Sequence, residues 1–306
     1  MILYDAIFII ELFLKNWEGK YDLLLEKSRL YSRLKQDLQL LENQLPYFIL
    51  EKVYSLDKIE RENYPGVFID LSRKFIYDNF SNRELSGQAT VQHFTDLRRH
   101  DLVQNLPEES GQPFSNLRCA AKLNESGVKF KGIEGGCLLN ILREKRNSKI
   151  PIPFLSGVEL KIPQIEVVDP TETVIRNLMA LEQCHYPSDT HICNYISFMV
   201  DLIKTEKDID LLIEKGIILN GMGDNATIAQ MFNRLGLNID LSASCYSGIV
   251  NDLNAHYKNG WNHSRATLKR VYFSNPWKGT GTIAGIILLL LTFIQTICSI
   301  KQVFWS

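Results

Sequence analysis

The sequence predicts a mainly helical protein with a small antiparallel sheet and one C-terminal transmembrane helix. Three observations lead to this fold class. Apolar residues recur at helical spacing along most of the chain, the spacing changes to short extended runs between about residues 128 and 168, and residues 279–300 carry no charge. A composition with 45% hydrophobic and 23% charged residues is typical of globular proteins and excludes disorder throughout.

The N-terminal half is expected to form a series of helices. Apolar residues spaced three, four and seven apart predict helices over residues 5–15 and 21–43. Pro46 and Pro65 break the pattern, and each can occupy the first turn of a new helix. Residues 81–115 have the weakest pattern, with one short helix expected there and a surface loop after it.

The middle of the chain changes from helix to strand. A short helix is expected to end at Gly127, which can adopt the left-handed backbone of a C-terminal cap. After it, the runs VKFK, CLLNILRE, GVELKI and QIEVV are separated by turn-forming residues. They predict three or four strands of an antiparallel sheet within about residues 128–168.

Helices resume after the sheet. Asp169 or Thr171 can cap the segment TETVIRNLMALEQC, and Asp224 can cap NATIAQMFNRLG, which Gly236 ends. The glycines of GMGDNA lack the lysine of a phosphate-binding P-loop, so this turn is interpreted as a helix cap.

The uncharged stretch at residues 279–300 is bounded by Lys278 and Lys301. Because about 20 helical residues cross a hydrocarbon core of about 30 Å, we expect a transmembrane helix there. This divides the chain into a mainly helical domain over residues 1–275, the span at 279–300 and a short tail at 301–306. A buried core helix is the alternative.

Basic residues gather before this expected span and predict its orientation. Positive charge next to a span is retained on the cytosolic side, so we expect a single-pass C-terminal anchor with the large domain facing the cytosol. Glycosylation sequons favour the opposite, lumenal orientation; they begin at Asn79, Asn124, Asn225 and Asn262. Aromatic and basic residues that could meet lipid headgroups are Lys258, Trp261, Arg265, Lys269, Arg270, Trp277 and Lys278. Alternatively, Trp261 with Leu268 and Tyr272 packs on the domain.

No set of residues suggests a cofactor, a metal or a nucleic acid. The net charge is −1, and basic clusters such as Arg98-Arg99-His100 are interpreted as solvated turns. The six cysteines have no regular spacing and are expected to be reduced thiols. Cys184, His185, His191 and Cys193 lie close together in sequence, but their spacing is not that of a structural zinc site.

One acidic segment is expected to have a structural role. Glu42 lies in apolar surroundings, where a carboxylate could act as a general acid or base. No catalytic partner is evident in the sequence. Together with Asn43 and Gln44, just before Pro46, it is instead expected to bond the free backbone groups at a helix end.

Several strings resemble a plant family called domain of unknown function 247, including LLENQLPYFILEKVY, LRCAAKLNESGVKFK and DPTETVIRNLMALEQC. The resemblance runs from Asp5 to about Ile300. It marks two family motifs, whose residues are Glu42, Asn43, Gln44 and Pro46, and Glu182, Gln183 and Cys184. It implies a helical fold with a C-terminal membrane segment and no assigned activity. Some grass members are thought to act in self-incompatibility, which implies recognition.

Members of that family usually carry further residues ahead of the first helix found here. The chain therefore looks shortened at its N-terminus. On this resemblance we expect Ile7, Phe8 and Ile10 to lack part of their cover.

Taken together, these features predict a membrane-anchored interaction or recognition protein without evident catalytic activity. Its expected partners are the lipid bilayer and a protein of unknown identity, with no nucleic acid and no cofactor. One alternative is an enzyme whose site assembles from distant residues such as Glu42, His93 or His185. Another is a sensor of lipid headgroups that uses the basic aromatic stretch between Lys258 and Lys278.

Overall fold

The computed structural model describes most of the 306-residue chain. The described residues are 2–19, 28–56, 65–77, 91–103, 106, 111–114, 116–146, 157–237, 239, 243–262, 264, 267 and 276–304. The N-terminal elements are α1 (Ile2–Glu18), α3 (Ser28–Asp37), the 3-10 helix η1 (Leu41–Asn43), α4 (Tyr47–Leu56), α5 (Phe68–Ile76), α6 (Phe94–Val103) and α7 (Ala120–Glu125). The strands are β1 (Lys129–Ile133), β2 (Leu142–Arg146), β3 (Gly157–Pro163), β4 (Ile165–Val167) and β5 (Ile218–Asn220). The remaining helices are α8 (Thr171–His185), α9 (His191–Leu202), α10 (Glu206–Glu214), α11 (Asn225–Leu235), α12 (Ser247–Lys258) and α14 (Pro276–Phe304).

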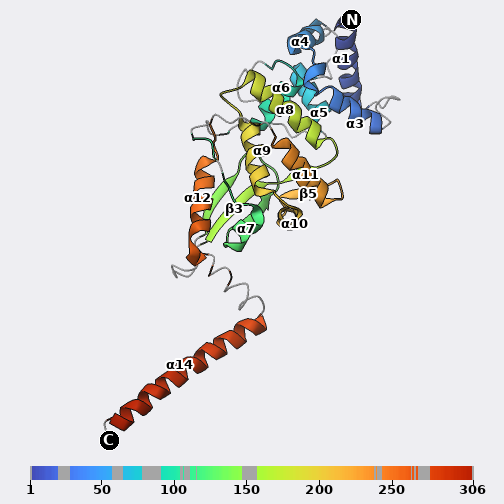
Figure 1. The fold of residues 1–306 in the computed structure, drawn as a ribbon. Coiled ribbons are helices and arrows are strands. Elements are labelled where there is room, and N and C mark those ends of the chain that lie inside the picture. Colours follow the sequence, from blue (N-terminus) through green and yellow to red (C-terminus); the bar gives the residue numbers. More distant parts are fainter. Residues whose placement is uncertain are drawn as a thin grey trace.

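The buried apolar side chains form two separate cores. One is built by α1, α4, α5 and the start of α6, and the other by the strands with α7 to α12. Figure 1 shows α1 and α4 next to the N-terminus, with α6 and α8 between them and the strands. The expected mainly helical fold with a small sheet is confirmed.

Stacked aromatic rings fill the N-terminal core. The ring of Phe13 lies 4.4 Å from that of Phe75 and 5.5 Å from that of Phe94, measured between centroids. Helix α1 supplies Phe13 and packs against both α4 and α5. Aromatic side chains bury large areas, so α1 is central to this core.

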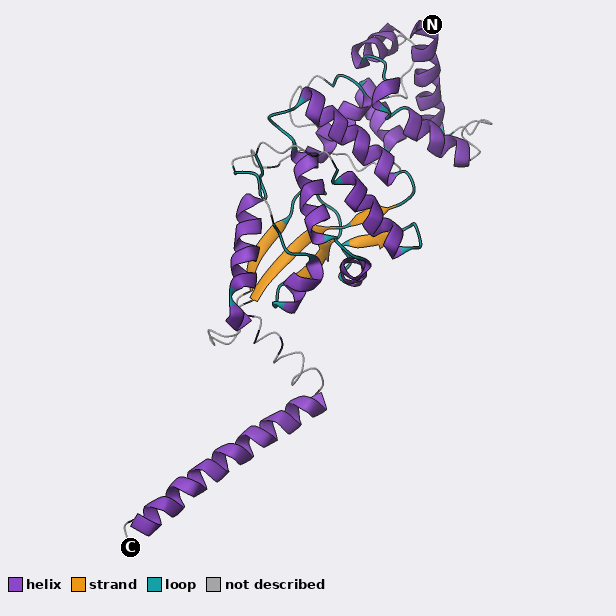
Figure 2. Ribbon diagram, viewed as in Figure 1, coloured by secondary structure: helices purple, strands orange, loops and turns teal. Residues whose placement is uncertain are grey.

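Strands β1 to β4 lie where the sequence predicts them, whereas β5 was not predicted, and the strand directions differ from the prediction. In the order β1-β3-β2, β3 pairs antiparallel with β2 and parallel with β1. Strands β4 and β5 form a second, parallel pair, and Figure 2 shows helices packed against this strand layer. The antiparallel prediction was therefore wrong for β1 and for β4, which run parallel to their partners β3 and β5. Strand β2 follows β1 in sequence but pairs with the opposite edge of β3.

Gly132 on β1 lies against the backbone of Gly216. A Cβ added at Gly132 would lie 2.0 Å from the Gly216 carbonyl oxygen. We expect Gly132→Ala to lower the free energy of unfolding by about 1–3 kcal/mol, as overpacking does, in urea denaturation followed by circular dichroism. Gly157→Ala on β3 is the matched control, because its added Cβ would meet nothing within 4 Å. Equal stability of the two variants would contradict this close approach.

The C-terminal segment corrects a prediction. Residues 279–300 lie within α14, yet in the part of the chain that the structure describes no helix is long and apolar enough to cross a membrane. The predicted transmembrane helix, single-pass anchor and membrane localisation were therefore wrong. The prediction was made from the absence of charge over residues 279–300. The orientation that placed residues 1–275 in the cytosol depended on that span and loses its basis.

Candidate functional site

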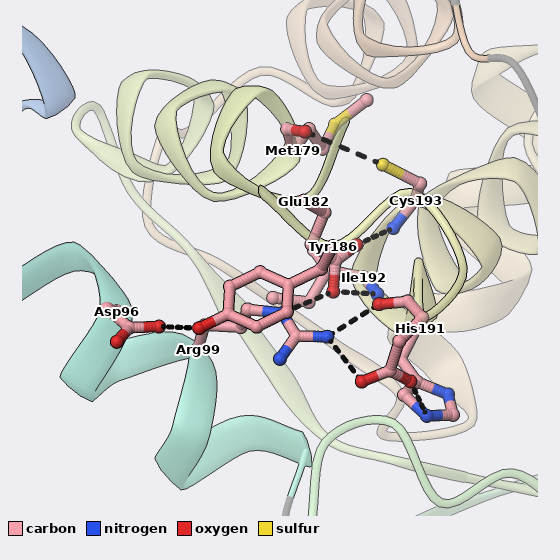
Figure 3. Close-up of polar contacts among 9 residues, drawn as sticks. Asp96, Arg99, Met179, Glu182, Tyr186, His191, Ile192 and Cys193 are labelled. Atoms are coloured by element: carbon pink, nitrogen blue, oxygen red, sulfur yellow. Dashed lines mark hydrogen bonds and ion pairs between the residues drawn. The ribbon is translucent and has the colours of Figure 1, made fainter. Parts of the chain in front are cut away.

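Helix α6 connects the two cores. Phe94 and Leu97 belong to the N-terminal core, whereas the helix also packs against α8 and α9. Its Arg99 is buried and faces those two helices, where polar side chains converge (Figure 3). We call Asp96, Arg99, Glu182, Tyr186, Asp189 and His191 the junction cluster.

Glu182, on α8, is fully buried at the centre of the junction cluster. Its Oε1 accepts hydrogen bonds from Arg99 Nε and from the Ile192 backbone N–H, both at 3.1 Å. Its Oε2 accepts the Cys193 N–H at 2.9 Å. Because the first N–H groups of a helix have no partner within it, Glu182 serves as a cap for the start of α9.

Arg99 links α6 to the turn between α8 and α9. Its Nη2 donates to the Asp189 carbonyl at 2.5 Å and to Asp189 Oδ2 at 2.9 Å. Its guanidinium carbon lies 3.9 Å from the centroid of the Tyr186 ring, and the Tyr186 hydroxyl donates to Asp96 Oδ1 at 2.7 Å. The guanidinium is thus held by charge, hydrogen bonds and ring stacking together.

Histidines border this cluster. His191 Nε2 lies 2.7 Å from Asp189 Oδ1, and burial lowers the pKa of His191 although Asp189 opposes the shift. The rings of His93 and His185 lie 6.4 Å apart edge to face. Burial also lowers the pKa of His93, whose Nδ1 accepts the Asp96 N–H at 3.1 Å. The imidazoles of His93 and His191 are therefore disfavoured as cations in the folded protein.

Burial dominates the electrostatics of Glu182. It raises the pKa of this carboxyl to about 7, although the N–H groups of Cys193 and Ile192 and the charge of Arg99 act to lower it. Glu182 has no exposed surface through which a substrate could reach it. The arrangement can bind a proton and hold helices together.

A family model described as plant protein of unknown function, DUF247, matches residues 1–291. The chain belongs to this family. The UPF0481 protein At3g47200 of Arabidopsis thaliana is 26% identical over 334 residues, covering 98% of the chain and 67% of the relative. The putative UPF0481 protein At3g02645 of the same plant is 23% identical over 235 residues, covering 76% and 41%. The chain thus spans about two thirds of one relative and under half of the other. No solved structure matches it.

The first DUF247 motif closes a helix end. The Gln44 amide donates to the carbonyls of Leu38 at 2.8 Å and Leu40 at 2.6 Å, and Gln44 Oε1 accepts the Phe94 N–H at 2.9 Å. Asn43 Nδ2 donates to the Asp37 carbonyl, the last of α3, at 3.1 Å. The predicted capping role is confirmed for Asn43 and Gln44.

The other residues of the two DUF247 motifs have different surroundings. Glu42 is exposed on η1, and Pro46 directly precedes α4. In the second motif Glu182 is buried, whereas Gln183 and Cys184 are exposed. The two regions are joined by the Leu41 N–H, which donates to Asn177 Oδ1 of α8 at 2.7 Å. Both motifs therefore lie where α6 and α8 connect the cores.

Arg99 was not identified from the sequence. The cluster Arg98-Arg99-His100 was interpreted as a solvated turn, but it lies within α6, and Arg99 is buried. Its partner Glu182 is 83 positions away, so no local pattern could reveal the pair. The signal available in the sequence was that Arg99 lies close to the apolar residues Phe94 and Leu97. That spacing could have indicated a helix that buries a charged residue.

The predicted membrane-interface residues are not brought together in the described structure. Lys258 ends α12 with an exposed side chain, and Trp261 is also exposed. Arg265, Lys269 and Arg270 lie outside the described residues. Trp277 and Lys278 begin α14, and their side chains are not among those described.

Metal-binding side chains do not converge either. Cys184 is exposed, whereas Cys193 is buried with its sulfur 3.8 Å from the Met179 carbonyl. Among the residues that the structure describes, no group of three or more His, Cys, Asp or Glu side chains could hold a metal ion.

Proposed function

We propose that this chain is a recognition protein that acts by binding another protein through an exposed apolar face of α1, and not by catalysis. The observation that carries this proposal is the exposure of large apolar side chains over the first two turns of that helix. This α1 face consists of Ile2, Leu3, Tyr4, Ile7 and Phe8.

The α1 face contrasts with the buried residues of the same helix. The side chains of the α1 face are between 43% and 77% exposed, whereas Ile9, Ile10 and Phe13 are buried. Leu3 with Ile7, and Tyr4 with Phe8, are four residues apart and therefore neighbours on the helix surface. Clustered apolar residues on a surface mark sites of interaction. Of the residues expected to lack cover, Ile7 and Phe8 are exposed and Ile10 is buried.

The helices packed against α1 also expose apolar side chains. Helix α1 packs against α4 and α5. Phe48 and Leu56 of α4 are exposed, as is Val67 just before α5. The N-terminal helices thus present several side chains that a partner could cover.

The junction cluster supports binding over catalysis as the activity. Its central carboxylate is fully buried and is bonded to Arg99 and to backbone N–H groups. A general acid or base must come within hydrogen-bonding reach of its substrate. In the described geometry, these polar groups hold helices in place.

The double variant Ile7→Glu and Phe8→Glu tests the proposal. Because two charges on the α1 face would oppose burial against an apolar partner, we expect proteins labelled by a proximity biotin ligase fused to the chain in plant cells to be lost. The matched control places two glutamates on exposed apolar positions elsewhere, Leu219→Glu and Leu237→Glu. Circular dichroism establishes that both variants fold. If both label the same proteins as the unchanged chain, the α1 face is not the binding surface.

A further inference from the structure

The guanidinium of Arg99 is shared by two carboxylates. Glu182 Oε1 lies 3.1 Å from Arg99 Nε, and Asp189 Oδ2 lies 2.9 Å from Arg99 Nη2. The buried Glu182 and the half-exposed Asp189 share one guanidinium, so the group carries one negative charge in excess when both carboxylates are ionised. Unbalanced charge is costly away from water, so the geometry favours the uptake of one proton.

Titratable and charged groups face this group from every surrounding element. Helix α6 contributes Asp96 and Arg99, α8 contributes Glu182, and the residue after α8 is Tyr186. The turn contributes Asp189, and α9 contributes His191, next to Asp189 Oδ1, and Cys193, whose N–H meets Glu182. Asp189 is about half exposed, whereas Glu182 is fully buried. Glu182 is therefore the carboxylate for which ionisation costs most.

We propose that Glu182 is a proton-binding switch at the junction of the two cores. In its ionised form Glu182 shares Arg99 with Asp189. In its protonated form it leaves the guanidinium paired with Asp189 alone, and the group becomes neutral. The proton comes from solvent and returns to it, and no other bond forms or breaks.

The direction of the pKa shift sets the pH range of the switch. Burial raises the pKa of Glu182 from its ordinary 4.5 to about 7. Between these values the folded chain holds a proton that the unfolded chain has released. The stability contributed by the proton on Glu182 is therefore fully present below about pH 4.5 and is lost as the pH rises through 7, whereas the hydrogen bonds of the carboxylate remain. If Arg99 and the N–H donors outweighed burial, the pKa would fall and this range would lie below pH 4.5.

His93 and His191 act in the opposite direction over an overlapping range. Burial lowers the pKa of both, so their contribution is lost as the pH falls below 6.5. The pH dependence of the whole protein therefore mixes both effects. The difference between the unchanged chain and Glu182→Gln isolates the switch.

Urea denaturation of both proteins at pH 5, 6, 7 and 8 provides the test. We expect the ratio of their unfolding constants, unchanged chain over variant, to rise by up to about tenfold per pH unit between pH 5 and 7 and then to level off. Glu166→Gln, at an exposed position of β4, should leave the pH dependence unchanged. A ratio that stays constant from pH 5 to 8, or that changes only below pH 4.5, would overturn the proposal.

A second measurement does not depend on a variant that folds. Carbon-13 NMR of the unchanged chain labelled at glutamate carboxyls should show one resonance that titrates with a midpoint near pH 7. If every glutamate carboxyl of the folded protein is already ionised at pH 6, Glu182 is not the switch.

Discussion

Glu182→Ala is expected to lower the free energy of unfolding by about 3 kcal/mol, measured by urea denaturation at pH 8. The substitution leaves the N–H groups of Ile192 and Cys193 without their acceptor and deprives Arg99 of one partner. Breaking a buried pair typically costs about 3–5 kcal/mol. We expect the lower end of this range because Asp189 still pairs with the guanidinium of Arg99.

Cys184→Ala is the matched control for Glu182→Ala. It lies two residues further along α8 with an exposed side chain, so we expect a change within about 0.5 kcal/mol. If the free energy of unfolding falls as little for Glu182→Ala as for the control, the carboxylate does not stabilise the contacts of α8 with α9 and α6.

Phe13→Ala is expected to cost about 3–5 kcal/mol, because it opens a cavity among stacked rings in the N-terminal core. The ring of Phe13 is fully buried and lies within 5.8 Å of Phe68, Phe75 and Phe94, measured between centroids. Thermal and urea denaturation followed by circular dichroism measure the loss.

Phe8→Ala removes the same side chain from the exposed side of the same helix. We expect this control to change stability by no more than about 0.5 kcal/mol. Similar losses for the two phenylalanines would contradict the separation of α1 into buried core residues and an exposed apolar face. That separation also underlies the proposed binding surface.

Features set by neighbouring residues could be predicted from the sequence. The Asp224 side chain accepts the N–H groups of Ala226 and Thr227, as expected of a cap, and Gly127 has the expected positive φ of 95°. Asn43 and Gln44 bond the carbonyls at the end of α3 and just beyond it. In each case the partner lies within a few residues, so the local pattern contains the whole interaction.

Features that depend on distant residues could not be predicted in the same way. Strand β5 pairs with β4 across α8, α9 and α10, and β1 passes over its neighbour in sequence to pair with β3. The partner of Arg99 is equally remote. Pairing across such separations depends on how the cores pack, which periodicity alone does not specify.

A double-mutant cycle between Arg99→Ala and Glu182→Ala tests the joining of the two cores most directly. If the two side chains interact across α6 and α8, the free energies of unfolding will depart from additivity by about 0.5–3 kcal/mol, with the second substitution costing less once the first is made. Strictly additive losses would contradict a direct link between Arg99 and Glu182.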